Sequence, residues 1–290
     1  MDKCLAELYP RFSRSEWQEA IAVGGVFIDG AVCEKSAHRT SGGRELMMDF
    51  SALPQPASDC SAEDIALNIV YEDADIIVLN KPSGLVVHPG RGNMWGTLQA
   101  ALLYHHPPAV KMVRAGIVHR LDKDTSGLLA VAKNPLTQKR LVEKFKKREI
   151  GREYLALVYG EPPPTGVINR PIGRSRREPT LMAVRASGRP AITRFAVEKR
   201  WPGFALLRCW LDSGRTHQIR VHLEYAGYPV VGDKHYVRRA RRASFGLTRQ
   251  ALHATALRLH HPTDDTQREW QCPPPPDIRL AIEMLDNNAG

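Results

Sequence analysis

Cysteine is scarce in this sequence, and no two cysteines stand at a metal-binding spacing. The five cysteines are scattered along 290 residues, and none forms a Cys-x-x-Cys pair. An odd number of isolated thiols is not typical of a disulfide framework or of a zinc site. We therefore expect reduced, structural cysteines, no bound metal and a cytoplasmic protein.

Long apolar runs are also absent. No stretch reaches the roughly 18 consecutive apolar residues of a membrane-spanning helix, and residues 1–14 lack the apolar core of a signal peptide. A Walker A loop, a dinucleotide fingerprint and a serine nucleophile elbow are missing as well. The sequence therefore indicates no membrane association and carries no cofactor motif.

Positive charge is in excess. The chain has 41 Lys and Arg against 31 Asp and Glu, a formal net charge of +10. Basic residues cluster in segments 144–148, 174–177 and 238–242. Single charge runs are usually solvated faces, but three of them on a basic chain favour contact with nucleic-acid phosphates.

The residue pattern divides the chain into three parts. Residues 1–50 predict a small module with two short helices, the second over 14–23 and capped by Ser13, followed by a tight hairpin around Asp29-Gly30. Residues 51–62 are polar and contain proline, which indicates a linker. Residues 63–290 form a larger domain.

Strands and helices alternate irregularly in the larger domain. The pattern predicts strands at 76–80, 154–158, 195–197, 204–210 and 218–223, and helices at 97–104, 135–147 and 277–285. This arrangement favours an α+β fold around a mixed or antiparallel β-sheet with flanking helices.

The segment 116–134, GIVHRLDKDTSGLLAVAKN, combines a single aspartate with a basic, glycine-punctuated loop. Asp122 precedes a small polar run and then the apolar run 128–132. An apolar strand anchors such a loop and presents the carboxylate at the edge of a sheet, as suits a nucleophile. Asp122 and Asp124 are too close in sequence to form a glycosidase pair.

Two other segments carry reactive side chains. Tyr154 shares a predicted strand face with apolar residues, so it is either a core residue or a stacking platform or proton acceptor for a base. Arg215, in SGRTHQIRVHL, is either the cation that pairs with Asp122 or part of a solvated corner. His217 and His222 are poorly spaced for a shared metal.

Six long segments appear together in the order found in one enzyme family. They span residues 71–93, 119–129, 152–160, 213–223, 227–236 and 249–262, and include HRLDKDTSGLL, REYLALVYG and GYPVVGDKHY. Through them nearly the whole chain resembles the RluA-type pseudouridine synthases, and within these the RluD-type subgroup of bacterial large-subunit ribosomal RNA enzymes. Residues 1–50 resemble the alpha-L RNA-binding module of that family.

The resemblance implies isomerisation of uridine to pseudouridine without a cofactor. It assigns Asp122 as the catalytic nucleophile, Arg215 as its guanidinium partner, and Tyr154 as the side chain that stacks near the base and relays a proton. Arg120 would fill the gap left when the uridine leaves its stack.

Further site residues are expected on the same grounds. The expected RNA contacts are Arg120, His119, Arg220, Lys146, Lys147, Arg148, Arg174, Arg238 and Arg239. The expected pocket residues are Leu121, Thr125, Ile219 and Leu223.

The subgroup resemblance implies a monomer that acts on the large-subunit hairpin that bridges to the small subunit. A synthase for transfer RNA or another ribosomal site, and a non-catalytic ribosome-assembly factor, remain alternatives. The family module begins with a strand and an Arg-Leu-Asp sequence, whereas this sequence starts at the first helix. Either the start of the sequence is assigned too late or the module is trimmed.

Overall fold

The computed structural model describes residues 1–9, 12, 14–40, 42–49, 60–90, 93–178, 180–237 and 245–288. The chain divides into two compact units, Met1–Ser61 and Ala62–Gly290. None of the described helices has the length and apolar character needed to cross a bilayer.

The first unit is a small helix and sheet module. It contains α1 (Asp2–Leu8), α2 (Arg14–Ala22), β1 (Val26–Ile28), β2 (Ala31–Val32) and β3 (Leu46–Met48), with the antiparallel strand order β2-β1-β3. The hairpin turn has φ of 49° at Asp29 and 80° at Gly30, as the predicted tight turn requires. Trp17 and Leu5 are fully buried in its core. The sheet is consistent with an S4-like module, and its strand β3 was not predicted.

Two sequence predictions fall where the structure gives no description. The cap residue Ser13 lies outside the described residues, as do residues 51–59, which make up most of the expected linker.

The second unit has an α+β fold, as predicted. Its strands are β4 (Ile69–Glu72), β5 (Ile76–Lys81), β6 (Ser126–Ala132), β7 (Gly151–Tyr159), β8 (Thr165–Asn169), β9 (Ile172–Arg174), β10 (Met182–Val184), β11 (Ile192–Trp201), β12 (Phe204–Leu211), β13 (Leu252–His260) and β14 (Gln267–Gln271). Its helices are α3 (Leu98–His105), α4 (Pro135–Lys147), α5 (Gln218–Tyr225) and α6 (Pro276–Asn288), with short 3-10 helices η2 (Pro107–Lys111) and η3 (Val113–Gly116).

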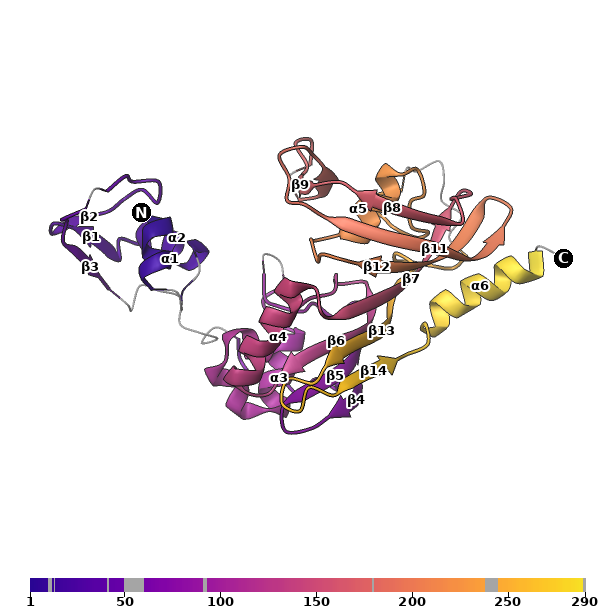
Figure 1. Ribbon diagram of the computed structural model, residues 1–290, viewed down its shortest axis with the longest axis horizontal. Helices are drawn as coiled ribbons and strands as arrows, with labels where there is room; N and C mark the ends of the chain where they lie inside the picture. The colour runs from indigo at the N-terminus through magenta and orange to yellow at the C-terminus, as the bar shows by residue number, and fades with distance from the viewer. Residues whose placement is uncertain are drawn as a thin grey trace. The chain divides into compact units, whose positions relative to one another are not determined.

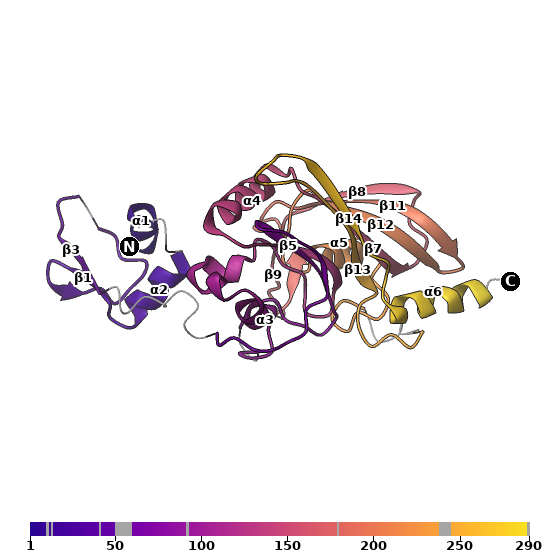
Figure 2. The same ribbon diagram turned by 90° about the horizontal axis from the view of Figure 1, so that it is seen from below.

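One mixed sheet runs through this unit. Its order is β4-β5-β6-β13-β7-β12-β11-β8, and β14 pairs with β13. The pair β6 and β13 is parallel, whereas the other pairs of this sheet are antiparallel. Figures 1 and 2 show α4 beside the β5–β6 half of the sheet and α5 beside the half that contains β11. The chain therefore brings the segment before β6, the start of β7 and the start of α5 into one region.

Helix α4 has the bounds that the sequence predicts, because both ends carry clear signals. The Asn134 side chain accepts a hydrogen bond from the Thr137 N–H at 2.9 Å, and Pro135 occupies the first turn. Three lysines in the last turn face the negative end of the helix dipole. The helix ends at Arg148, whose backbone is left-handed with φ 64°.

The predicted strand at 218–223 is wrong, because this segment is the start of helix α5. All of residues 218–223 are buried, so this helix has no solvent-facing side over that segment. The sequence therefore lacks the polar face that reveals a helical period. The apolar side chains of Ile219, Val221 and Leu223 alternate and imitate a strand.

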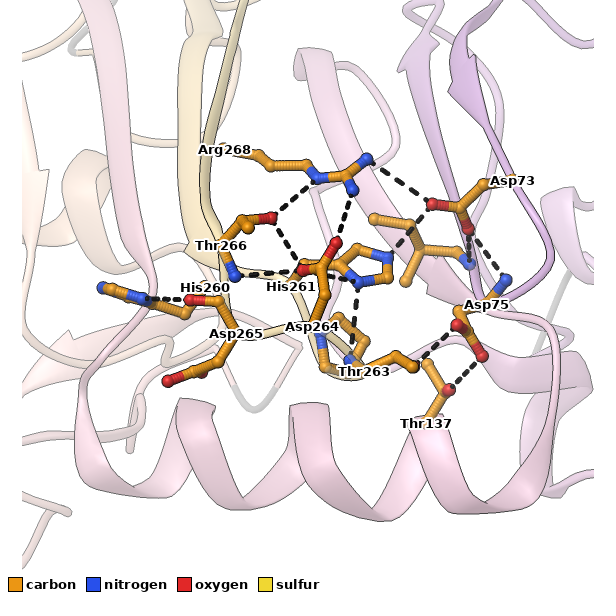
Figure 3. A network of polar contacts seen from close by, with 12 residues as sticks. Asp73, Asp75, Thr137, His260, His261, Thr263, Asp264, Asp265, Thr266 and Arg268 are labelled. Carbon is orange, nitrogen blue, oxygen red and sulfur yellow. Dashed lines mark hydrogen bonds and ion pairs between the residues drawn. The ribbon is translucent and has the colours of Figure 1, made fainter.

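A polar network fastens the turn before β5 to α4 and to the β13–β14 turn (Figure 3). Asp75 accepts hydrogen bonds from Thr137 at 3.1 Å and from Thr263 at 2.6 Å. The ring of His261 lies between the carboxylates of Asp73 and Asp264, at 3.0 and 3.3 Å. These contacts hold α4 in place, and α4 forms one wall of the site described below.

Candidate active site

Asp122 lies in a loop that is fixed on both sides of the carboxylate. The fully buried Lys81 ammonium donates to the Lys123 carbonyl at 2.9 Å. The buried Arg249 guanidinium donates to the Asp124 carbonyl at 2.9 Å and pairs with Asp277 on α6. The backbone on either side of Asp122 is therefore tied to the sheet and to the last helix.

Glycine at position 127 allows this loop to enter β6. Gly127 has φ 116°, and a Cβ atom there would lie 2.2 Å from the Ala254 carbonyl oxygen. Such a contact is far closer than van der Waals packing allows, so only glycine permits β6 and β13 to pair at this point.

Arg220 is the guanidinium that contacts Asp122. Its Nη1 donates to Asp122 Oδ2 at 3.1 Å, while its Nε and Nη2 donate to the two oxygens of Asp233 at 2.6 and 2.9 Å. Burial opposes the charge of Arg220, but the bonds to Asp233 and the charges of both carboxylates outweigh it, so the pKa of Arg220 is raised. The guanidinium is thus a permanent, oriented cation beside Asp122.

The prediction that Arg215 pairs with Asp122 is therefore wrong. The side chain of Arg215 donates to the Pro190 carbonyl at 3.2 Å, and its backbone N–H is held by Gln218 at 3.0 Å. Because α5 begins just after this loop, Arg220 lies inside the fold and Arg215 at its edge. The expected RNA contact at Arg220 stays a prediction; in the free protein this side chain is buried and bonded to two carboxylates.

Asp233 fixes the direction of Arg220. This carboxylate is buried, and its Oδ1 also accepts the backbone N–H groups of His235 and Tyr236 at 3.0 and 3.2 Å. The Tyr236 ring lies under the guanidinium, with the Arg220 Cζ 5.0 Å from the ring centroid. One face of Arg220 is thereby covered, and its Nη1 is left for Asp122.

Tyr154 lies on β7 in the same cavity and is almost fully buried. Burial raises the pKa of its hydroxyl, with the Asp122 charge acting in the same direction, so the resting phenol is neutral. In the described part of the chain its hydroxyl makes no hydrogen bond, which leaves the group for a ligand.

Asp122 and Tyr154 line a cavity of about 330 Å³. This volume lies at the lower end of the range for ligand pockets, roughly 300–1,000 Å³, and suits a single nucleoside. Among the described residues that line it, Asp122 is the one carboxylate, whereas Arg114, Arg120, Arg152 and Arg215 are cations. The cavity is therefore suited to a ligand that carries negative charge around a polar base.

Three of the four predicted pocket residues line the cavity. These are Leu121, Thr125 and Ile219. Leu223, the fourth, does not line it, because it lies one turn further along α5 and is fully buried in the core.

The predicted RNA contacts have different surroundings. Arg120 is exposed at the cavity. His119 also lines it, but its Nε2 accepts the Ala130 N–H at 2.9 Å, and burial lowers its pKa to about 3, so the ring is neutral. The exposed residues away from the cavity lining are Lys146, Lys147, Arg148 and Arg174. Arg238 and Arg239 lie outside the described residues.

Comparison with known proteins identifies the class of this site. A family model described as RNA pseudouridylate synthase matches residues 75–225. The chain is 44% identical to ribosomal large subunit pseudouridine synthase D of Escherichia coli strain K12, over 98% of this chain and 90% of that protein. The chain belongs to the RNA pseudouridylate synthase family.

Further relatives agree with this membership. The protein of the same name from Vibrio parahaemolyticus is also 44% identical, over 98% of this chain and 90% of its own length. The solved structure named human RNA pseudouridylate synthase domain containing 1 aligns with a TM-score of 0.59 and 31% identity, over 73% of this chain and 85% of that chain. The predicted family, fold and enzyme class are thus confirmed: the protein is an RNA pseudouridine synthase.

The sequence did not indicate Asp233 or Arg152 as site residues. Asp233 lies in the segment GYPVVGDKHY, which gave no reason to separate it from surface aspartates. A helical reading of 218–225 would have buried Arg220 and suggested that it needs a carboxylate, because charged side chains are seldom buried unpaired.

Proposed function

We propose that this enzyme converts uridines of large-subunit ribosomal RNA into pseudouridine, with Asp122 as the catalytic nucleophile. The names of its relatives support the substrate. The observation that carries the catalytic assignment is the Asp122 carboxylate, ion-paired at 3.1 Å with the buried Arg220 and lining a nucleoside-sized cavity.

The reaction needs the uridine outside its helix. Extrusion of a stacked base costs a few kcal/mol, and the cavity then encloses the base and ribose. Arg120, exposed at the cavity next to the Asp122 loop, is placed to fill the vacated position, because a planar guanidinium can stack on bases and contact phosphate.

The isomerisation exchanges one bond for another. The bond between ribose C1′ and uracil N1 breaks, the base turns, and a bond forms between C1′ and C5. The hydrogen on C5 is lost and N1 gains a proton, so the atoms balance. Asp122 acts at the sugar and base while Arg220 holds its carboxylate in position at the cavity.

We assign Tyr154 two roles at the base of the bound uridine, stacking and proton transfer. Its ring lines the cavity in a largely buried position, and its hydroxyl makes no hydrogen bond to a described residue. The neutral phenol serves as a relay: it accepts the proton lost from C5 as it passes its own proton on toward N1 or solvent, and so ends unchanged. The raised pKa of Tyr154 keeps this phenol protonated in the free enzyme.

The substrate test is a direct mapping of products. The purified protein is incubated with large-subunit rRNA, small-subunit rRNA and transfer RNA transcripts, and pseudouridines are located in each. We expect new pseudouridines in the large-subunit hairpin that contacts the small subunit. Modification of transfer RNA alone would contradict the proposed substrate, and no modification of any RNA would contradict the activity.

A further inference from the structure

The wall of the cavity formed by the end of α4, the start of β7 and loop 212–217 carries an arginine without a counter-ion. In the described part of the chain, the Arg152 guanidinium makes one hydrogen bond, from Nη2 to the Leu211 carbonyl at 3.3 Å. Its Nε is buried with no partner. No ion pair joins Arg152 to a described carboxylate within 4.0 Å. A partly buried cation with several free donors favours an anionic ligand.

Two carboxylates next to the Arg152 contacts are engaged elsewhere: Glu153, its neighbour in the chain, and Asp212, the neighbour of the Leu211 acceptor. Glu153 bonds to Arg208 and to the Trp210 indole. Asp212 pairs with Arg194 at 3.2 Å. The adjacent residues therefore do not balance the charge of Arg152.

Further cations surround this wall. Burial lowers the pKa of Arg215, and the positive charges of Arg189 and Arg148 lower it further. Like charges within mutual range destabilise the free protein, and a polyanion relieves that repulsion. Arg152, near the start of β7, and Arg215, in the loop, line the cavity, whereas Arg148 caps α4 beyond the lining and within electrostatic range of Arg215.

Two neighbouring residues define the position of the Arg152 guanidinium. Its Cζ lies 5.3 Å from the centroid of the Phe145 ring, which lines the same cavity. Its Nη1 lies where a side chain at Gly214 would be, since a Cβ there would come within 2.9 Å. Glycine at 214 thus makes room for the guanidinium beside the cavity.

We infer that Arg152 binds a backbone phosphate of the RNA strand next to the flipped uridine, with Arg215 and Arg148 extending the phosphate path. This inference rests on the proposed function, because it takes the ligand to be the strand that carries the target. Phosphate fits better than a base edge, since the wall offers several cations and no free carboxylate among its described lining residues.

The test removes the protein charge and the RNA charge separately and together. Large-subunit hairpin RNAs are made with a neutral methylphosphonate at one flanking phosphate at a time, and affinity and turnover are measured for wild type and Arg152→Gln. We expect Arg152→Gln to weaken binding of unmodified RNA by about 10-fold. The slope of log affinity against log salt should fall by about 0.7–1, with kcat at saturating RNA changed less than about 3-fold.

The position of the contact follows from coupling between the two changes. At one methylphosphonate position, wild type should lose affinity while Arg152→Gln loses none. Equal losses for both proteins at every position, or an unchanged affinity and salt slope in Arg152→Gln, would overturn the inference.

Two further variants exclude general effects. Gly214→Ala keeps every charge but displaces the guanidinium, and its fold should survive because the displaced atom ends a flexible side chain. It should weaken binding at the same phosphate. Arg200→Gln removes an exposed charge near the end of β11, where Arg200 pairs with Ala205 of β12, and should leave the methylphosphonate pattern unchanged.

The proposed function is judged separately, by pseudouridine formation in wild type. Binding without modification would refute the function, while the methylphosphonate coupling would still decide whether Arg152 holds a phosphate. Normal modification without coupling would refute the phosphate contact alone.

Discussion

The Arg220 guanidinium lies 3.1 Å from the Asp122 carboxylate and is held from behind by Asp233, with contacts of 2.6 and 2.9 Å. The two residues that meet are 98 positions apart in the sequence. The arrangement separates two tasks: Asp233 orients the guanidinium, and Arg220 presents one nitrogen to Asp122. Electrostatic support of this kind requires no reorganisation when the substrate enters.

Arg220→Lys should be far more harmful to turnover than Arg215→Lys. Lysine keeps the charge but cannot bridge Asp122 and Asp233 with a rigid fork, so kcat should fall by about 10²-fold or more. Arg215→Lys should mainly weaken RNA binding. Single-turnover kinetics at saturating RNA separates the two effects, and equal losses of kcat would contradict the assigned partner of Asp122.

Arg220→Ala should also destabilise the fold. The buried Asp233 would lose its cation, and breaking such a buried pair costs about 3–5 kcal/mol. Chemical denaturation of Arg220→Ala beside Arg215→Ala measures this. Similar free energies of unfolding in the two variants would show that the Asp233 contact contributes little.

Tyr154→Phe should separate the ring from the hydroxyl. The ring remains in the cavity, so RNA affinity should change less than about 2-fold. Loss of a proton-transfer group typically lowers the rate by about 10²–10⁴-fold, so kcat of this variant should fall by at least about 10²-fold. The measurement is kcat beside binding affinity. Wild-type kcat in this variant would restrict Tyr154 to stacking.

The carboxylate that lines the cavity, unlike its guanidinium partner, could be predicted from the sequence. Asp122 stands in a distinctive loop before an apolar strand, and Tyr154 falls on an apolar strand face. Arg215 and Arg220 lie in the same segment, and only the helical conformation of 218–225 selects between them. Alternating apolar residues in a fully buried helix give no signal that distinguishes it from a strand.

Other elements show the same dependence on local signals. Helix α4 was predicted to its ends because Asn134, Pro135 and the terminal lysines mark them. The strand β3 has three residues and forms through its pairing with β1, so propensity alone does not indicate it.

Gly127→Ala should destabilise the enzyme severely. The new Cβ would meet the Ala254 carbonyl at 2.2 Å, so the β6–β13 pair must separate, at a cost of about 3 kcal/mol or more. Gly203→Ala is the matched control, because Gly203 has φ 76° but open space around it, and should cost only about 1–2 kcal/mol. Thermal denaturation compares them, and equal shifts would show that backbone strain alone matters at 127.

Stability should fall on mild acidification because several histidines have lowered pKa values, three of them by a large amount. Burial lowers the pKa of His88 and His253 to about 4 and that of His119 to about 3. Between pH 6.5 and about 4 the unfolded chain binds protons that the native state does not, so the free energy of unfolding rises with pH in this window. For these three groups we expect a loss of about 5 kcal/mol between pH 7 and pH 5.

The variant His253→Gln tests the source of this slope. It removes one of the three most strongly shifted groups, while His217 and His222 also contribute, so it should flatten the pH dependence by at most about a third. Denaturation curves at half-unit pH steps provide the measurement. A slope unchanged by the substitution would assign the acid sensitivity to other groups.

The catalytic role of Asp122 is tested most directly by mapping pseudouridines in large-subunit rRNA treated with wild type and with Asp122→Asn. We expect new pseudouridines with wild type and a rate at least ~10³-fold lower with Asp122→Asn, while RNA binding and folding stay near wild type. Substantial turnover by a well-folded Asp122→Asn protein would contradict this role.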